Sequence, residues 1–181
     1  MRGFVSPPHH MRFDIITIFP QLFDSFLSES IVARAKHKKQ ITINIHDPRA
    51  FTKDSHRTVD DRPYGGGPGM LLKIDPLVKT LRSIRKRKKS RIIFLTPAGA
   101  PLTQRKAERY AQKYDQLVFI CGRYEGVDAR IKHYIDEALS VGPYVLNGGE
   151  VPAMLVVEAV MRMIPGVLGN IDSISQESFG K

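Results

Sequence analysis

The sequence predicts an α/β fold with a mainly parallel sheet and helices on both faces. Short runs of β-branched and aromatic residues alternate along the chain with segments whose apolar residues recur at helical spacing. Alternation of this kind favours a parallel sheet. The chain has 181 residues, 42% of them hydrophobic, which suits one globular domain with a substantial core.

The first half of the chain contains two expected strands and two expected helices. Residues 13–19 (FDIITIF) and 41–45 are the strands. Apolar spacing over residues 22–35 predicts a helix that ends in basic residues, which suit a helix C-terminus. Residues 74–84 form the second expected helix, with an aspartate and a proline at its start.

The second half predicts strands at 91–95 and 117–121, a helix at 103–114 between them, and a helix from 152 to 163. The loop sequence TPAG closes the first of these strands and GRYEG closes the second. The third glycine-bearing loop is YVLNGGEVP, residues 144–152, and it follows a short apolar run. Ligands of parallel sheets gather in loops at the carboxyl ends of strands, so we expect the three loops to enclose a ligand through backbone groups.

Residues 57–70 read RTVDDRPYGGGPGM, the segment of the chain that is hardest to explain as ordinary packing. Its glycines permit positive φ and a close approach of the backbone to a ligand, while its prolines limit flexibility. We expect no regular helix or strand here. A preformed polar loop suits a flat, hydrogen-bonding ligand, and an ordinary solvent-exposed turn is the alternative.

The formal charge is +10, from 28 Lys and Arg against 18 Asp and Glu, which favours polyanionic partners such as nucleic acid. Six of the eight residues at 82–89 are basic, and a second cluster lies at 34–39. Contact with phosphates and simple solvation of a helix end are equally open interpretations of each cluster.

Several classes of protein are disfavoured. No apolar run approaches the roughly 18 residues of a membrane helix, so we expect a soluble, cytoplasmic protein without membrane contact. Cys121 is the only cysteine and is expected to be a small buried hydrophobic residue, with a reactive thiol as the alternative. No phosphate-loop, GxGxxG or HExxH pattern is present. His46 and His56 are expected to be surface or capping groups.

Three further residues carry candidate chemistry. Glu125, in the GRYEG loop, could act as acid, base or metal ligand, or it could pair with its neighbour Arg123 on the surface. Arg162 lies near the end of the last helix, where a cation also complements the helix dipole. Taken by itself, Glu177 is an unremarkable residue in a polar tail.

Four runs carry a resemblance to a known family: RTVDDRPYGGGPGM, CGRYEGVDAR, YVLNGGEVPAM and IPGVLG. Together and in this order they resemble the bacterial tRNA (guanine-N1)-methyltransferases, the TrmD family. The resemblance covers residues 11–179. It implies an enzyme that transfers a methyl group from S-adenosylmethionine to N1 of the guanine at tRNA position 37, next to the anticodon. It also implies a homodimer of the SPOUT class, with a trefoil knot near the C-terminal end of the sheet.

Site residues follow from the same resemblance. The implied cofactor-binding residues are Phe94, Leu95, Thr96, Pro97, Gly122, Tyr124, Glu125, Val141, Tyr144, Leu146, Gly148, Gly149 and Pro152. The implied guanine and tRNA contacts are Asp60, Asp61, Gly67, Pro68, Gly69 and Met70.

The resemblance also assigns catalytic roles. A base must remove the proton on guanine N1 before its lone pair can attack the methyl group, and Glu177 stands where the family places that base. Most relatives have aspartate at this position, so the longer side chain is a departure. Arg162 would stabilise charge on guanine O6. The resemblance further implies that Glu125 would help to place a magnesium ion.

The expected domain organisation is an extension at residues 1–10, a SPOUT methyltransferase domain at 11–170 and the start of a linker at 171–181, with the family's C-terminal tRNA-binding domain absent. Whether Met1 or Met11 is the natural start is open. Two other functions remain in competition. A non-catalytic RNA-binding module would explain the charge but not the three glycine loops, and a nucleotide hydrolase is disfavoured because no phosphate loop is present.

Overall fold

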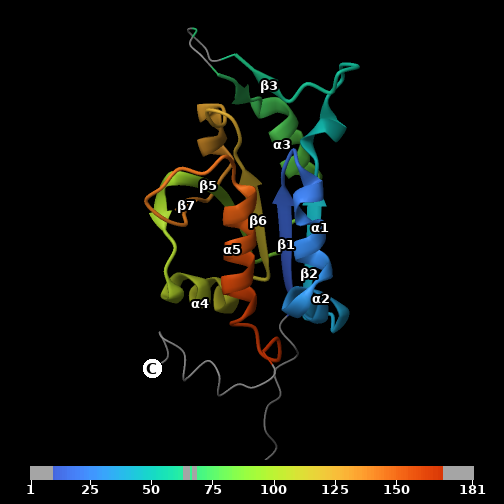
Figure 1. Ribbon diagram of the computed structural model, residues 1–181, viewed down its shortest axis with the longest axis vertical. Helices are drawn as coiled ribbons and strands as arrows, with labels where there is room; N and C mark the ends of the chain where they lie inside the picture. Colours follow the sequence, from blue (N-terminus) through green and yellow to red (C-terminus); the bar gives the residue numbers. More distant parts are fainter. Residues whose placement is uncertain (1–9, 63–65, 67–68, 169–181) are drawn as a thin grey trace, which may run out of the picture.

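A computed structural model describes residues 10–62, 66 and 69–168 of the chain. A five-stranded sheet forms the centre of the molecule (Figure 1). Its strand order is β2-β1-β6-β5-β7, and every neighbouring pair is parallel. The strands are β1 (Met11–Ile16), β2 (Ile41–His46), β5 (Ser90–Pro101), β6 (Gln116–Cys121) and β7 (Glu137–Ser140). The predicted parallel sheet is confirmed.

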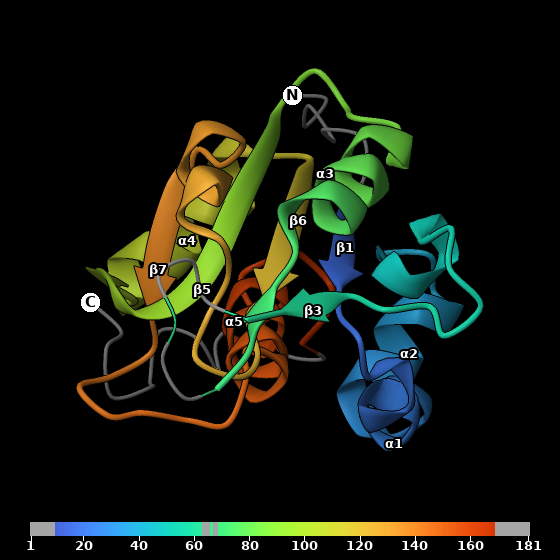
Figure 2. The same cartoon turned by 90° about the horizontal axis from the view of Figure 1, so that it is seen from above.

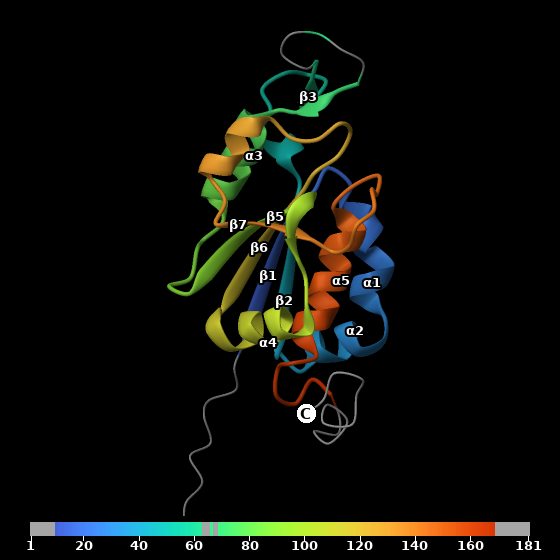
Figure 3. The same ribbon diagram turned by 90° about the vertical axis from the view of Figure 1, so that its left-hand side faces the viewer.

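Helices cover both faces of this sheet, as predicted (Figures 2 and 3). They are α1 (Asp24–Ser28), α2 (Ser30–His37), α3 (Ile74–Ser83), α4 (Gln104–Lys113) and α5 (Glu150–Met161). Three 3-10 turns accompany them: η1 (Pro20–Phe23), η2 (Pro48–Phe51) and η3 (Ala129–His133). Helices α2, α4 and α5 contribute to one core, and α3 with η3 contributes to the other.

The alternation of side chains along β1 explains the two cores. Phe13 and Ile15 point to one face of the sheet, where the Phe13 ring stacks on Phe119 with ring centroids 6.4 Å apart. Ile16 belongs to the core on the other face. Burial of each such side chain contributes about 1.5–3 kcal/mol, so both layers stabilise the sheet. The predicted burial of Cys121 is confirmed, since this residue is 1% exposed, and burial raises the pKa of its thiol.

Element boundaries differ from the predictions in places. The helix expected at 22–35 is divided into η1, α1 and α2, because Glu29 is extended and Ser30 has a left-handed φ of +54°. The first strand begins earlier than expected, at Met11, and ends at Ile16. Strand β7 was not predicted because it has only four residues.

The TPAG sequence is not the loop that was predicted. It continues β5 as far as Pro101, and the pairing register with β7 shifts between Leu95 and Ala100. The reason is a close approach of the two backbones, since a Cβ at Gly99 would lie 2.4 Å from the backbone nitrogen of Leu139. Only glycine fits this contact.

Asp60 and Asp61 form a strand, so the prediction of no regular structure was wrong for these two residues. They make up β3 (Asp60–Asp61), which pairs antiparallel with β4 (Leu71–Leu72). This small ribbon lies above the carboxyl ends of the main sheet in Figure 1. The ribbon holds the two ends of the glycine-rich segment side by side.

His46 is not the surface or capping group that was predicted. It is half-buried in β2, with Nε2 2.8 Å from Oδ1 of the buried Asp14. His56 is exposed in a turn, as expected. Among the helices of the described residues, none is long and apolar enough to cross a membrane.

Candidate functional site

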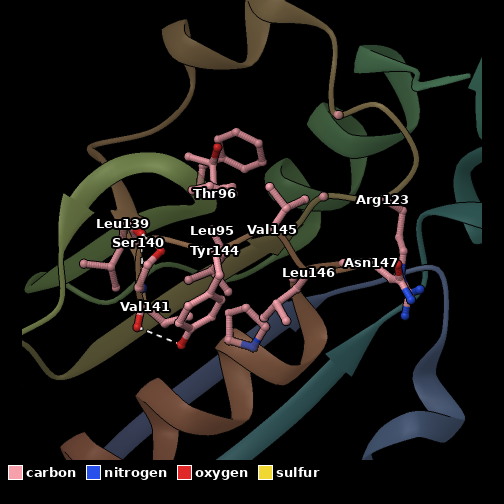
Figure 4. Close-up of a pocket in the computed structure, with 18 of the residues that line it drawn as sticks. Leu95, Thr96, Arg123, Leu139, Ser140, Val141, Tyr144, Val145, Leu146 and Asn147 are labelled. Atoms are coloured by element: carbon pink, nitrogen blue, oxygen red, sulfur yellow. Dashed lines mark hydrogen bonds between the residues drawn. The ribbon is translucent and has the colours of Figure 1, made fainter. Parts of the chain in front are cut away.

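A cavity of about 280 Å³ opens beside the middle of β5 and the carboxyl ends of β6 and β7 (Figure 4). This volume is close to the roughly 300 Å³ at which small-molecule pockets begin. Its lining comes from three segments far apart in the sequence: residues 94–97, 122–126 and 139–152. They include parts of all three segments singled out from the sequence, although TPAG belongs to strand β5 and is not a loop, and the prediction that these segments meet is confirmed.

Every residue that the resemblance assigned to the cofactor lies in this lining, from Phe94 to Pro152. The side chains that surround the cavity are mostly apolar, and most glycines of the lining are partly exposed. Figure 4 shows Tyr144 inside the pocket, where its hydroxyl donates a hydrogen bond of 3.1 Å to the Val141 carbonyl. Apolar walls with a few placed polar groups are typical of a site for a small, flat ligand.

Close backbone packing at Gly149 closes the floor of the pocket. The Gly149 amide donates to the Gly122 carbonyl over 2.9 Å. A Cβ at Gly149 would lie 2.6 Å from the Cα of Cys121, closer than real contacts allow. The loop before α5 therefore reaches β6 only because this residue is glycine.

Arg123 pairs with Glu150 and not, as one interpretation of the sequence proposed, with its neighbour Glu125. Arg123 Nε donates to Glu150 Oε2 over 2.9 Å, and Thr17 donates its hydroxyl to Glu150 Oε1 over 2.7 Å. The Arg123 guanidinium also lies 4.5 Å from the centroid of the Phe19 ring, a cation–π contact. Sequence reasoning missed Glu150 and Thr17. The only signal in the sequence was that Glu150, an acidic residue, stands shortly before Pro152, and this pattern also suits an ordinary helix start.

Tyr124 joins the pocket to the β3–β4 ribbon. Its backbone has a left-handed φ of +59°, unusual for a residue with a side chain. Burial and then the nearby Asp60 carboxylate, to which its hydroxyl is hydrogen-bonded, raise the pKa of Tyr124. The raised pKa keeps the phenol protonated at neutral pH, and its hydroxyl lies beside Asp60.

The glycine-rich segment that was predicted to contact the substrate borders the same pocket. The Glu125 amide donates to the Met70 carbonyl, and the Leu72 amide donates to the Gly126 carbonyl, each over 3.1 Å. A Cβ at Gly69 would lie only 2.3 Å from Glu125 Cγ. Asp61 is exposed, with Oδ2 3.9 Å from Lys73 Nζ. Gly67 and Pro68 lie outside the described residues.

Arg162 is not brought to the pocket. It caps the C-terminal end of α5, whereas the pocket residue Pro152 lies in the first turn of this helix. At 1.5 Å per residue, the two positions are about 15 Å apart. Arg162 instead lines a shallow surface hollow together with Gln104, Leu155, Glu158, Ala159 and Met163. Glu177 lies outside the described residues.

The family comparison decides what this arrangement is. A family model described as tRNA (guanine-1)-methyltransferase TrmD matches residues 11–181. This chain belongs to the TrmD family.

Individual relatives agree with this membership. Proteins named tRNA (guanine-N(1)-)-methyltransferase are 49% identical in Dictyoglomus turgidum over 169 residues, 46% in Heliobacterium modesticaldum over 176 residues and 44% in Enterococcus faecalis over 171 residues. Each alignment covers 93% of this chain, and 68%, 65% and 69% of the respective relative. The chain thus spans about two thirds of the length of the TrmD proteins it matches.

Magnesium has no visible set of ligands in the part of this TrmD chain that the structure describes. No group of three or more His, Cys, Asp or Glu side chains is arranged there to hold a metal ion. Among the described residues, Glu125 is the one carboxylate in the lining of the pocket. The magnesium role expected for Glu125 therefore has no structural support.

Proposed function

We propose that this protein transfers a methyl group from S-adenosylmethionine to N1 of the guanine at position 37 of tRNA. The observation that carries the proposal is the convergence of three distant segments on one apolar pocket, with the substrate segment at its rim, in a chain of the TrmD family. When bound, S-adenosylmethionine supplies a methyl group on a positively charged sulfur.

The lining fits such a cofactor. Pro97, Val141 and Leu146 are among the apolar residues around the cavity and would pack against the faces of an adenine. Backbone groups of the glycine loops would read its edge and the ribose. Glu125, as the carboxylate of the lining, would favour the positive charge near the sulfur.

Residues of this chain would then prepare the guanine. The segment from Asp60 to Met70 would hold the base next to Glu125, because Gly69 and Met70 contact that residue. Glu177 would take the proton from guanine N1, which frees a lone pair on that nitrogen for attack in line with the methyl group. A cation or hydrogen-bond donor facing O6 would stabilise the charge that develops there, and Arg162 is the proposed residue.

This role for Arg162 requires a second copy of the chain. Arg162 lies at the C-terminal end of α5, whereas the pocket of the same chain lies at the N-terminal end of this helix, so Arg162 could only reach the pocket of a partner subunit. A homodimer is part of the proposal for this reason. Exposed apolar side chains beside the pocket and along α5 support it: Tyr144, Val145, Leu146, Val151 and Leu155. Val145 is 85% exposed in the single chain, an aliphatic side chain that a partner subunit would cover.

We also propose the SPOUT-type trefoil knot for residues 139–152. The support is the tight return of this segment to the end of β6, where Gly149 packs on Cys121 and Gly148 bridges to Arg123. Knots are rare in proteins, so tracing the threading of this segment in an experimental structure is the direct test.

A non-catalytic RNA-binding module is the weaker candidate. It would use the basic surface, but it gives no role to the pocket or to the three loops that build it. The catalytic proposal accounts for both.

The experiment combines cofactor binding with methyl transfer. Calorimetric titration should show one S-adenosylmethionine per chain, and labelled cofactor should methylate a tRNA transcript with guanine at position 37 but not one with adenine there. Glu177→Gln should abolish turnover and keep cofactor affinity. Binding of tRNA without cofactor binding or methylation would favour the non-catalytic module, and unchanged turnover of Glu177→Gln would remove that residue as the base.

A further inference from the structure

The end of α3 and the loop that leads into β5 form the most basic segment of the chain. Six of the eight residues from Arg82 to Lys89 carry a positive charge. Five of their side chains are exposed: Arg82, Arg85, Lys86, Lys88 and Lys89. None of these five forms an ion pair with an acidic residue in the part of the chain that the structure describes.

We call residues 85–89 the basic loop. Its backbone is held by Gln116, which is completely buried at the start of β6. Gln116 Oε1 accepts a hydrogen bond of 2.7 Å from the Arg87 amide. Its Nε2 donates to the Arg85 carbonyl over 3.3 Å and to Asp14 Oδ2 over 2.7 Å. A buried amide thus uses both ends to tie the basic loop to the sheet.

Arg87 differs from the other cations of the basic loop because its guanidinium serves as an anchor. Arg87 Nη1 donates to the carbonyls of His10 and Asp115 over 2.8 and 3.1 Å. The Lys89 carbonyl in turn accepts from the Asp115 amide over 2.9 Å. The backbone of the basic loop is therefore fixed at three of its five residues. The basic side chains other than Arg87 project from this ordered backbone.

The basic loop lies at the opposite end of the sheet from the pocket. It precedes β5 directly, whereas the pocket opens at the carboxyl ends of the strands. Six residues of a strand span about 20 Å, which sets the scale of the separation. In Figure 3 the loop that joins α3 to β5 projects from the side of the sheet opposite to α1 and α2.

We propose that the basic loop binds the sugar-phosphate backbone of the RNA substrate, at a distance from the guanine in the pocket. Exposed cations without acidic partners supply the charge that phosphates require. Because the backbone of the basic loop is already fixed, less conformational entropy is lost when its cations bind phosphates. The loop has no apolar or aromatic residue between Arg85 and Lys89, so it lacks the central anchors of a protein–protein interface, and RNA is the better match. This inference rests on the proposed RNA substrate.

The test replaces Arg85, Lys86 and Lys88 together with glutamine. The dissociation constant of a fluorescent tRNA transcript with guanine at position 37 is measured by anisotropy at several salt concentrations. We expect it to rise by roughly tenfold at moderate salt, and the slope of log affinity against log salt to become shallower by about 2–3. The affinity for S-adenosylmethionine and the methylation rate at saturating RNA should not change, which also shows that the variant is folded.

The matched control removes the same charge elsewhere. Arg34, Lys38 and Lys39 are exposed at the end of α2, a helix on the other face of the sheet, and are also changed together to glutamine. A smaller effect of this control on RNA affinity and salt slope would support the basic loop as a specific site. Equal effects would overturn it in favour of general electrostatic attraction.

Other outcomes separate the two proposals. An unchanged RNA dissociation constant in the basic-loop variant, or no saturable RNA binding by the unmodified chain, would overturn the RNA site. Specific RNA binding that depends on the basic loop, in a chain that methylates no guanine, would leave the RNA site standing and refute the proposed function. Binding of an acidic protein that depends on the loop, without RNA binding, would overturn the RNA assignment.

Discussion

Arg123 and Glu150 are joined by a hydrogen bond of 2.9 Å between Nε and Oε2. Glu150 is 1% exposed, and its other oxygen accepts from the Thr17 hydroxyl. The pair therefore links three segments at the rim of the pocket: the end of β1, the loop after β6 and the first turn of α5. An acidic side chain in this first turn is also favoured by the helix dipole.

Glu150→Gln should destabilise both the fold and the pocket. The amide can keep one hydrogen bond, but Arg123 loses its counter-charge in a site where its side chain is only 20% exposed. We expect the free energy of unfolding in urea to fall by about 1–3 kcal/mol, and the affinity for S-adenosylmethionine to fall with it. Glu158→Gln, on the exposed side of the same helix, should change stability by less than about 0.5 kcal/mol. Equal effects of the two changes would show that the buried ion pair is not what holds the loops.

Two glycines of the pocket should respond differently to alanine. A Cβ at Gly149 would lie 2.6 Å from the Cα of Cys121 and 3.1 Å from the Gly122 nitrogen, so backbone must move. A Cβ at Gly122 would lie 3.3 Å from the edge of the Phe94 ring, which can turn slightly. Gly149→Ala should cost about 1–3 kcal/mol and lose most cofactor binding in calorimetry, whereas Gly122→Ala should keep it. Normal cofactor affinity of Gly149→Ala would mean that the close contact does not shape the pocket.

The sequence was a good guide to elements whose own residues determine their structure. Strand β6 could be predicted from its apolar run alone, because a central strand buried on both faces has few polar positions. The extension of β5 through Pro97 and Gly99 could not, because it depends on pairing with β7, a strand of four residues far along the chain. Proline and glycine are ordinary loop signals, and tertiary pairing outweighed them here.

The same distinction applies to the site. Glycine-bearing loops after strands predicted where a pocket would form, and a family resemblance supplied the individual lining residues. Neither the loop pattern nor the resemblance predicted that Arg123 would pair with Glu150 and not with Glu125, because the pairing depends on where α5 begins relative to β6. A partner 27 residues away in the sequence leaves no local pattern.

Gly69→Ala should uncouple the substrate segment from Glu125. The new Cβ would lie 2.3 Å from Glu125 Cγ, so either the segment or the carboxylate must shift. Gly66→Ala is the matched control, because both glycines have a positive φ, +91° and +81°, but no atom of the described residues lies within 4 Å of a Cβ added at Gly66. The two variants share the backbone strain, and only one has the clash. We expect the methylation rate of Gly69→Ala at saturating cofactor to fall well below that of Gly66→Ala. Equal rates of the two variants would mean that the contact with Glu125 does not matter for turnover.

Asp14 should make stability depend on pH below pH 4. Burial by itself would raise the pKa of this carboxyl group, but hydrogen bonds from His46, Arg12, Gln116 and Asn44 outweigh burial and lower the pKa from 3.8 to about 2. A folded-state pKa below the unfolded value means that the stabilisation is present above about pH 4 and is lost as the pH falls toward 2. The shift corresponds to about 2 kcal/mol.

Urea unfolding between pH 6 and pH 2.5 measures this contribution. The unmodified chain should lose stability across the acidic part of this range. Asp14→Asn should be less stable at pH 6, because the charge that balances Arg12 and orients Gln116 is gone, and its stability should change less between pH 4 and 2.5. Asp24→Asn, at an exposed position in α1, should keep the pH dependence of the unmodified chain. The same acid dependence in Asp14→Asn as in the unmodified chain would place the titrating group elsewhere.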